Sequence, residues 1–224
     1  MADIGTNVAR VRARVAEAAE RAGRQPGDIL LVAVTKTVDV GRIREAVDCG
    51  LRVFGENRVQ EAREKVSLVP GVAWHLIGSL QRNKVKEALR LFVMIHSVDS
   101  WLLAEELSRR ANAAGTLIDV LIEVNVGGET SKHGVEPEGA MDLALRAAGL
   151  PGVRVRGLMG MAPLVDQAEE ARPYFRRLRE LRDRIQEAHP DRGIRELSMG
   201  MTNDFEVAVE EGSTMVRVGR ALFA

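Results

Sequence analysis

Three features of the sequence combine residue types and spacings that could support chemistry. Lys36 ends the apolar run in "LVAVTKT", Arg217 interrupts the apolar run in "TMVRVG", and small residues form the turns of "LSMGMTND" and "VRVGRALF". A primary amine in a partly apolar mouth is favoured in its neutral form, which is the nucleophile for a Schiff base with an aldehyde or ketone. Backbone N–H groups at glycine turns and helix starts favour a bound anion such as phosphate.

Each of these features also has a simpler interpretation. Taken alone, Lys36 is better explained as a side chain that reaches solvent or pairs with an acid such as Glu56. The turn in "LSMGMTND" fits ordinary helix capping by Asn203 with Glu206. A buried Arg217 needs an acceptor, which is either a protein carboxylate or a ligand atom. The residues taken one by one leave these alternatives open.

Other polar residues give weaker signals. Asn57 with Gln60 favours a helix N-cap over a ligand contact. His75 in "AWHLIG" is more typical of a core histidine than of a catalyst. The four histidines do not have the spacing of a zinc-binding HExxH motif, and no cluster of Cys and His indicates a metal site.

The composition narrows the class of protein. Of the 224 residues 46% are hydrophobic, and Lys plus Arg balance Asp plus Glu at 32 each. No basic field or polybasic segment predicts nucleic-acid or membrane binding. The single cysteine, Cys49, excludes an internal disulfide, and the charged N-terminus lacks the apolar stretch of a signal peptide. We therefore expect a cytoplasmic protein.

The elements that must position these residues alternate regularly along the chain. β-branched runs predict strands, and helical spacing of apolar residues predicts a helix between successive strands and one before the first. This pattern favours a single (β/α)8 barrel domain over residues 1–224, with an extra N-terminal helix. A doubly wound open sheet is the alternative, but no GxGxxG motif follows the first strand. The predicted strands are 29–35, 52–54, 73–77, 93–97, 117–126, 153–159, 194–199 and 214–218.

In such a barrel the carboxyl ends of the strands form one functional face. Lys36 ends strand one, the two glycine turns end strands seven and eight, and alternation places Arg217 on the same face as Met215. Phosphate sites of barrels are commonly built from the loops after strands seven and eight. One compact ligand carries an aldehyde and a phosphate: pyridoxal 5′-phosphate. Its ring nitrogen would accept a hydrogen bond from Arg217.

Several stretches together resemble the pyridoxal phosphate homeostasis proteins, a family of barrels similar to the N-terminal domain of alanine racemase. The resemblance runs from the first strand to the last residues and implies that pyridoxal phosphate is the cofactor. The stretches are "LVAVTKT", "FGENRVQEAREK", "WHLIGSLQRNK", "VLIEVNVGGETSKHGV", "GLMGMAP", "LSMGMTNDFEVAV" and "VRVGRALF".

The resemblance also implies a set of cofactor contacts. Lys36 would carry the cofactor, Arg217 would meet its ring nitrogen, and Ser198 and Gly200 would hold its phosphate. Relatives often have threonine or serine where Arg220 stands, so a phosphate contact there would use the backbone N–H. The implied cofactor-binding residues are Lys36, Asn57, Ser198, Gly200, Arg217, Gly219 and Arg220.

A carrier of the cofactor is favoured over an enzyme. We expect no second domain like that of the racemases, and the sequence offers no clear second acid–base group opposite Lys36. An arginine at the ring nitrogen disfavours its protonation and weakens the electron sink. The alternatives are a slow pyridoxal-phosphate-dependent amino-acid racemase and a Schiff-base aldolase. Apo forms of pyridoxal-phosphate enzymes are the candidate recipients.

Overall fold

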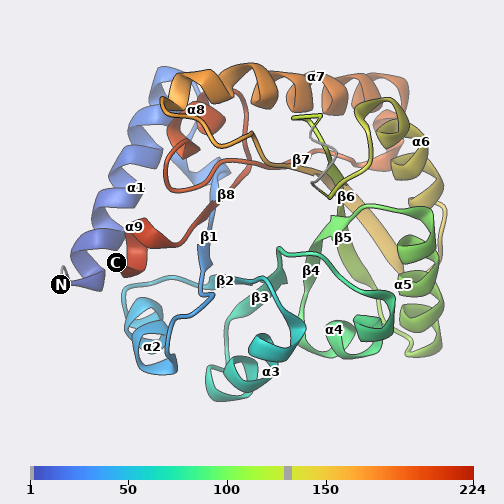
Figure 1. Cartoon of the computed structure of the whole chain (residues 1–224), viewed down its shortest axis with the longest axis horizontal. Coiled ribbons are helices and arrows are strands. Elements are labelled where there is room, and N and C mark those ends of the chain that lie inside the picture. The colour runs from blue at the N-terminus through green and yellow to red at the C-terminus, as the bar shows by residue number, and fades with distance from the viewer. Residues whose placement is uncertain (1–2, 129–132) are drawn as a thin grey trace.

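Eight parallel strands close into a barrel in chain order, from β1 to β8, and helices surround the barrel (Figure 1). The computed structural model describes residues 3–128 and 133–224, so part of "VLIEVNVGGETSKHGV" lies outside the described residues. The predicted (β/α)8 barrel is confirmed, and the open doubly wound sheet is wrong because β1 pairs with both β2 and β8.

The strands follow the predicted runs closely. Each predicted strand overlaps an observed one, and β7 keeps the smallest share of its predicted length, with three of six expected residues in the strand. Val32 of β1 lies opposite Arg217 of β8, which fixes the register where the barrel closes. The strands are β1 Leu30–Val34, β2 Val53–Glu56, β3 Ala73–Leu76, β4 Met94–Val98, β5 Ile118–Val124, β6 Val153–Gly160, β7 Glu196–Ser198 and β8 Met215–Val218.

Two helices begin with a 3-10 turn. The spacing of apolar residues predicts helices over 81–91 and 167–188, but these segments open with the 3-10 turns Arg82–Lys84 and Ala168–Ala171 before their α-helical parts. In the described part of the chain, no helix is both long and apolar enough to cross a membrane. The helices are α1 Ile4–Arg21, α2 Val40–Asp48, α3 Val59–Leu68, α4 Val85–Leu91, α5 Trp101–Ala113, α6 Pro137–Ala147, α7 Arg172–Ala188, α8 Phe205–Glu210 and α9 Arg220–Phe223.

Apolar side chains fill two separate layers, because successive strand residues point to opposite faces. The larger layer lies between the strands and the helices and includes the fully buried rings of Phe54, Phe175 and Phe205. The smaller layer fills the inside of the barrel. Its buried members are Val32, Met94, Leu121, Met159 and Met215. The polar side chains of the barrel interior pack against this apolar layer.

Helix α1 joins the beginning of the chain to its end. The Asn7 side-chain amide donates to the carbonyl of Leu222 at 3.1 Å, and Arg14 binds Glu206 of α8 at 2.7 Å. The two ends of the chain accordingly lie side by side (Figure 1). α1 therefore covers the side of the barrel where β8 meets β1.

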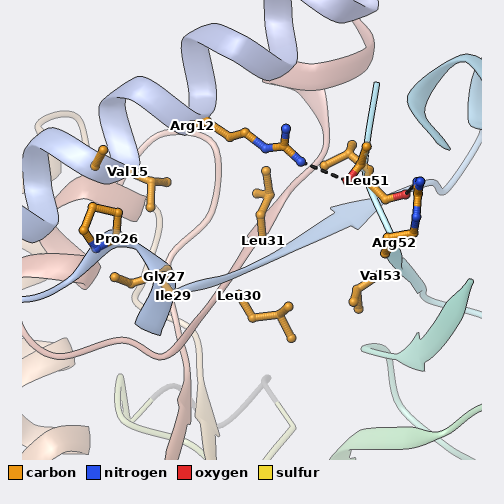
Figure 2. Close-up of a pocket in the computed structure, with 12 residues that line it drawn as sticks. Arg12, Val15, Pro26, Gly27, Ile29, Leu30, Leu31, Leu51, Arg52 and Val53 are labelled. Carbon is orange, nitrogen blue, oxygen red and sulfur yellow. Dashed lines mark hydrogen bonds between the residues drawn. The ribbon is translucent and has the colours of Figure 1, made fainter. Parts of the chain in front are cut away.

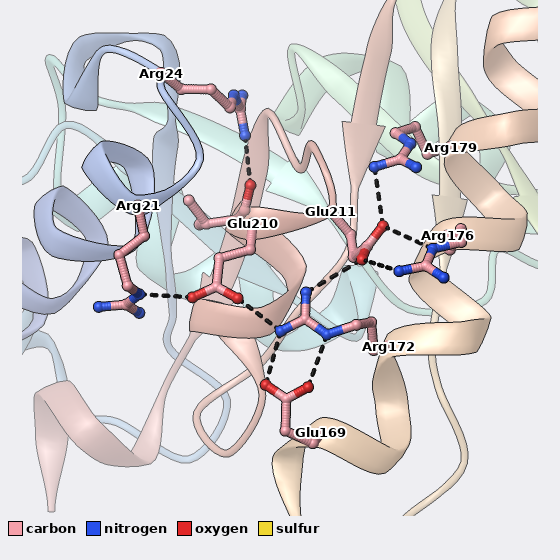
Figure 3. Close-up of polar contacts among 9 residues, drawn as sticks. Arg21, Arg24, Glu169, Arg172, Arg176, Arg179, Glu210 and Glu211 are labelled. Atoms are coloured by element: carbon pink, nitrogen blue, oxygen red, sulfur yellow. Dashed lines mark hydrogen bonds and ion pairs between the residues drawn. The ribbon is translucent and has the colours of Figure 1, made fainter.

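A network of ion pairs joins α7 to α8 and extends to α1 (Figure 3). Arg172 binds Glu169, Glu210 and Glu211 at 2.7, 2.6 and 3.1 Å. The carboxylate of the nearly buried Glu211 also forms ion pairs with two further arginines of α7. A network of this kind holds the three helices in register more than it adds net stability, because desolvation offsets much of the attraction.

A cavity of about 480 Å³ lies between α1 and the first residues of β1 and β2 (Figure 2). Leu30, Leu31 and Val53 line it, and Arg12 crosses its edge to donate to the carbonyl of Gly50 at 2.9 Å. The cavity is at the amino ends of the strands, whereas Lys36 follows the carboxyl end of β1. It is therefore separate from the face on which the sequence places function.

Candidate functional site at the mouth of the barrel

Lys36 follows β1 at the mouth of the barrel, where its side chain is exposed. Its amine has no hydrogen bond or ion pair with any residue in 3–128 or 133–224. The next residue, Thr37, has a φ of 63°, a left-handed conformation that is costly for a β-branched residue. Such strain is found where a fold holds a functional group in place. Lys36 lies two residues after the end of β1, and its exposure agrees with the interpretation of a side chain that reaches solvent.

Glu56 does not pair with Lys36. Its Oε1 accepts from Lys65 Nζ at 2.7 Å and from the Thr35 hydroxyl at 2.5 Å. The same lysine amine also donates to the Thr35 carbonyl at 2.7 Å. The simpler interpretation of Lys36 as the partner of Glu56 is therefore wrong, because Lys65 forms that ion pair through Oε1, while Glu56 Oε2 is buried without a hydrogen-bond partner in the described residues.

Arg217 lies inside the barrel, as alternation predicts, and is 4% exposed. Its guanidinium donates to the Ser198 hydroxyl at 2.6 Å and to the Gly160 carbonyl at 3.1 Å. Both acceptors are uncharged, so the expected protein carboxylate does not bind it directly. Burial lowers the pKa of Arg217 to about 10, although Asp204 and Glu123 oppose the shift from a distance. The side chain therefore stays cationic at neutral pH.

The turns after β7 and β8 meet each other beside β1. The Arg217 amide donates to the Gly200 carbonyl at 3.0 Å, and Arg220 reaches the Asn203 side chain at 3.4 Å. A Cβ on Gly219 would lie 3.2 Å from the Val34 carbonyl, so glycine lets this turn approach the end of β1. Gly200, Gly219 and Arg220 thus lie on one rim, and Gly219 adjoins Val34, which is two residues before Lys36.

The predicted capping of α8 is wrong in one residue. The helix begins at Phe205, with Asp204 rather than Asn203 at the N-cap. The Asp204 carboxylate accepts instead from the Met201 amide at 2.6 Å and tightens the turn. This leaves Asn203 free to contact the neighbouring turn.

Asn57 is not a helix cap either. Helix α3 begins at Val59 with Arg58 at the N-cap, so the capping interpretation of Asn57 with Gln60 is wrong. The side-chain oxygen of Asn57 is buried and has no hydrogen-bond partner within the described residues. A buried acceptor without a partner is uncommon and suits a contact with a ligand donor.

Ser198 ends β7 and is fully buried. Its hydroxyl contacts Arg217 and, at 2.9 Å, the Nδ1 of His96. The structure thus places Ser198 with the interior arginine, whereas Gly200, Gly219 and Arg220 form the rim. A contact of Ser198 with phosphate stays a prediction.

Glu123 of β5 is a site residue that the sequence reasoning missed. It lies two residues after Leu121 of the barrel interior and is 3% exposed. Its Oε2 is buried and has no partner in the described chain. Burial and, secondarily, Asp99 raise the pKa of Glu123 to about 7. The alternation that placed Arg217 inside the barrel would have found it in "LIEVNV".

The raised pKa of Glu123 predicts a pH-dependent stability. Unfolding lets this carboxyl ionise near its ordinary value, so its contribution to stability is present at low pH and is lost as the pH rises through about 7. The difference in the free energy of unfolding between Glu123→Gln and wild type should be about 2 to 3 kcal/mol more favourable to the variant at pH 8 than at pH 5. Denaturant unfolding at both pH values measures this difference, with the exposed Glu105→Gln as control. A difference that is the same at both pH values would contradict the assignment.

Three comparisons with known proteins agree with this geometry. Residues 6–224 match the family model "Alanine racemase, N-terminal domain". The pyridoxal phosphate homeostasis protein of Aquifex aeolicus is 49% identical over 218 residues, which cover 96% of this chain and 95% of the relative. The protein of the same name from Escherichia coli K12 is 40% identical over 100% of this chain and 97% of its own length.

The chain belongs to the pyridoxal phosphate homeostasis protein family. A structural relative, PipY of Synechococcus elongatus solved with PLP bound, has a TM-score of 0.86 and 37% identity and covers 99% of this chain and 100% of its own. An alanine racemase of Clostridium difficile has a TM-score of 0.77 at 16% identity, with 98% of this chain matched to 58% of that one. That likeness shows the barrel fold alone. The family resemblance predicted from the sequence is confirmed.

Proposed function

We propose that this chain binds pyridoxal 5′-phosphate at the barrel mouth and serves to hold and release it inside the cell, in the cytoplasm. The observation that carries the proposal is the Lys36 amine, which has no partner among the described residues and lies on the same rim as the Gly219 turn, four residues beyond the register of the buried Arg217 on β1. Relatives of this chain are named pyridoxal phosphate homeostasis proteins, and PipY was solved with PLP bound. The whole chain, residues 1–224, would act as one binding unit.

The residues present fit the chemistry of this cofactor. Pyridoxal phosphate supplies an aldehyde that bonds to a primary amine, a ring nitrogen that accepts a hydrogen bond, and a dianionic phosphate. Lys36 offers the amine, Arg217 offers a buried donor, and Asn57 offers a buried acceptor without a partner. The turns that contain Gly200, Gly219 and Arg220 would hold the phosphate, with Ser198 below them.

We infer that catalysis on amino acids is inefficient. The two direct partners of Arg217 are uncharged, so its positive charge is not neutralised by a contact, and it opposes protonation of a ring nitrogen beside it. A ring that stays unprotonated withdraws electrons poorly. This supports a carrier that delivers the cofactor to apo enzymes.

A slow racemase is the second candidate, and Glu123 is the observation that favours it. The strand β5 lies across the closed barrel from β1, so Glu123 and Lys36 come from opposite walls. With a pKa of about 7, Glu123 can both give and take a proton at neutral pH.

Absorption spectroscopy of the wild-type protein tests both candidates. Added pyridoxal phosphate should give a band in the visible or near ultraviolet, and borohydride should fix the label on a peptide that contains Lys36. In deuterated water, single amino acids should then exchange their α-proton no faster than with free cofactor. A colourless protein would overturn the binding proposal, and rapid exchange that is lost in Glu123→Gln would establish the racemase.

A further inference from the structure

A line of buried polar side chains crosses the inside of the barrel and ends on Arg217. Arg217 Nη1 donates to Ser198 Oγ at 2.6 Å, Ser198 Oγ lies 2.9 Å from His96 Nδ1, and His96 Nε2 lies 3.0 Å from His75 Nδ1. The four residues come from β8, β7, β4 and β3. None is more than 5% exposed. We name this line the interior relay.

The arginine fixes the direction of every hydrogen bond in the interior relay. A guanidinium can only donate, so the Ser198 oxygen accepts from it. The Ser198 hydroxyl hydrogen then has one available acceptor among its contacts, the Nδ1 of His96. His96 must therefore carry its proton on Nε2 and donate it to Nδ1 of His75. Both histidines are held in the Nε2–H tautomer.

The interior relay carries no charge except that of Arg217. Burial lowers the pKa of His75 to about 4, and burial, with the nearby charge of Arg217, lowers the pKa of His96 well below its ordinary value. Both rings are consequently neutral at pH 7. Neutral partners orient the guanidinium without cancelling its positive charge, whereas a carboxylate in their place would cancel it.

We propose that His75 and His96 are positioning residues that act through Ser198 to set the direction and charge of the Arg217 guanidinium. The consequence for ligand binding rests on the proposed function, because it concerns the group that a ring nitrogen would meet. A side chain with four rotatable bonds has many orientations, and two neutral anchors, Ser198 and Gly160, leave it one. Removing a histidine or Ser198 from the interior relay should therefore loosen the orientation of the Arg217 guanidinium.

The tautomers can be measured on the wild-type protein without any cofactor. Nitrogen-15 NMR of the imidazole rings at pH 7 should show both His75 and His96 neutral and protonated on Nε2. Ser198→Ala should leave His75 unchanged and alter the Nδ1 resonance of His96, which loses its donor. A His96 that carries its proton on Nδ1, or is charged at pH 7, would overturn the relay whether or not the protein binds pyridoxal phosphate.

Variants test whether the relay positions Arg217 or merely fills the barrel. His96→Leu should weaken pyridoxal phosphate binding about tenfold, because the Ser198 hydroxyl loses its acceptor. It should also shift the absorption maximum of the bound cofactor. His96→Gln, whose amide can both accept and donate, should restore binding to within about threefold. The matched control is His189→Asn, because His189 lies outside the relay at the end of α7.

The possible outcomes separate the two proposals. A wild-type protein without an absorption band would end the proposed function, while the tautomer measurement would still decide the relay. A His96→Leu protein with a lower melting temperature but unchanged affinity and absorption maximum would show that the relay is only structural. If His96→Leu fails to fold, Ser198→Ala provides the same comparison of affinity and absorption maximum, since it keeps both histidine rings in the core.

Discussion

Replacing Lys36 by alanine should abolish labelling of the protein by pyridoxal phosphate and borohydride. The substitution removes the amine that would bond to the aldehyde and leaves only contacts to the ring and phosphate. We expect the remaining affinity to be about a hundredfold weaker, equivalent to about 3 kcal/mol. Because Lys36 is exposed and has no partner in the described chain, the free energy of unfolding should change by less than about 0.5 kcal/mol.

Lys86→Ala is the matched control for this experiment, since Lys86 is also exposed but lies on α4, one of the helices outside the barrel. It should label as strongly as wild type. Mass spectrometry of the fixed label should identify Lys36 and not Lys65, whose amine is occupied by Glu56 and Thr35. A label that persists in Lys36→Ala, or that maps to another lysine, would show that the cofactor is held elsewhere.

Gly200→Ala should destabilise the fold by about 3 to 5 kcal/mol. Gly200 has a φ of 90°, where a side chain is strained, and its Cβ would lie 2.5 Å from Ala208 Cβ and 2.9 Å from Phe205 Cα. The strain and the forced movement of α8 each cost about 1 to 3 kcal/mol. Because the Arg217 amide is bonded to the Gly200 carbonyl, the rim should move with the helix.

Urea unfolding measures this effect, with Gly27→Ala as the control. A Cβ on Gly27 meets nothing within 4 Å, and its φ is not positive. That variant should unfold within about 1 kcal/mol of wild type. A Gly200→Ala protein as stable as the control would mean that the turn after β7 can relax away from α8 at little cost.

The architecture follows from the sequence because its determinants are local. Runs such as "LLVAV" favour strands because they are short and rich in β-branched residues, and the amphipathic stretches between them favour covering helices. The ends of elements are less predictable. The helix expected at 167–188 opens with a 3-10 turn, and α9 was not expected, because tertiary contacts at these ends override local preference.

The candidate site was predicted from charged residues in or at the end of apolar runs and from glycine turns at the ends of strands. Lys36, Arg217 and the two turns stood out for these reasons, whereas Glu123, which also interrupts an apolar run, was missed. The partners could not be predicted, because Lys65, which binds Glu56, lies on a helix whose rotation about its axis is set by packing. Within the interior relay, His96 contacts Ser198 although the two residues are 102 positions apart in the sequence. No spacing rule in the sequence indicates that contact.

The joining of α1 to the last residues of the chain has a consequence for synthesis on the ribosome. Asn7 and its partner Leu222 are 215 positions apart. At about 5 to 20 residues per second, roughly 10 to 40 s separate the appearance of the two. For that interval the apolar face of α1, with Val8, Val11 and Val15, can meet α2 but lacks its contacts with α8 and α9. The nascent chain therefore presents an amphipathic helix first and completes its cover last, so part of the apolar face of α1 stays exposed during translation.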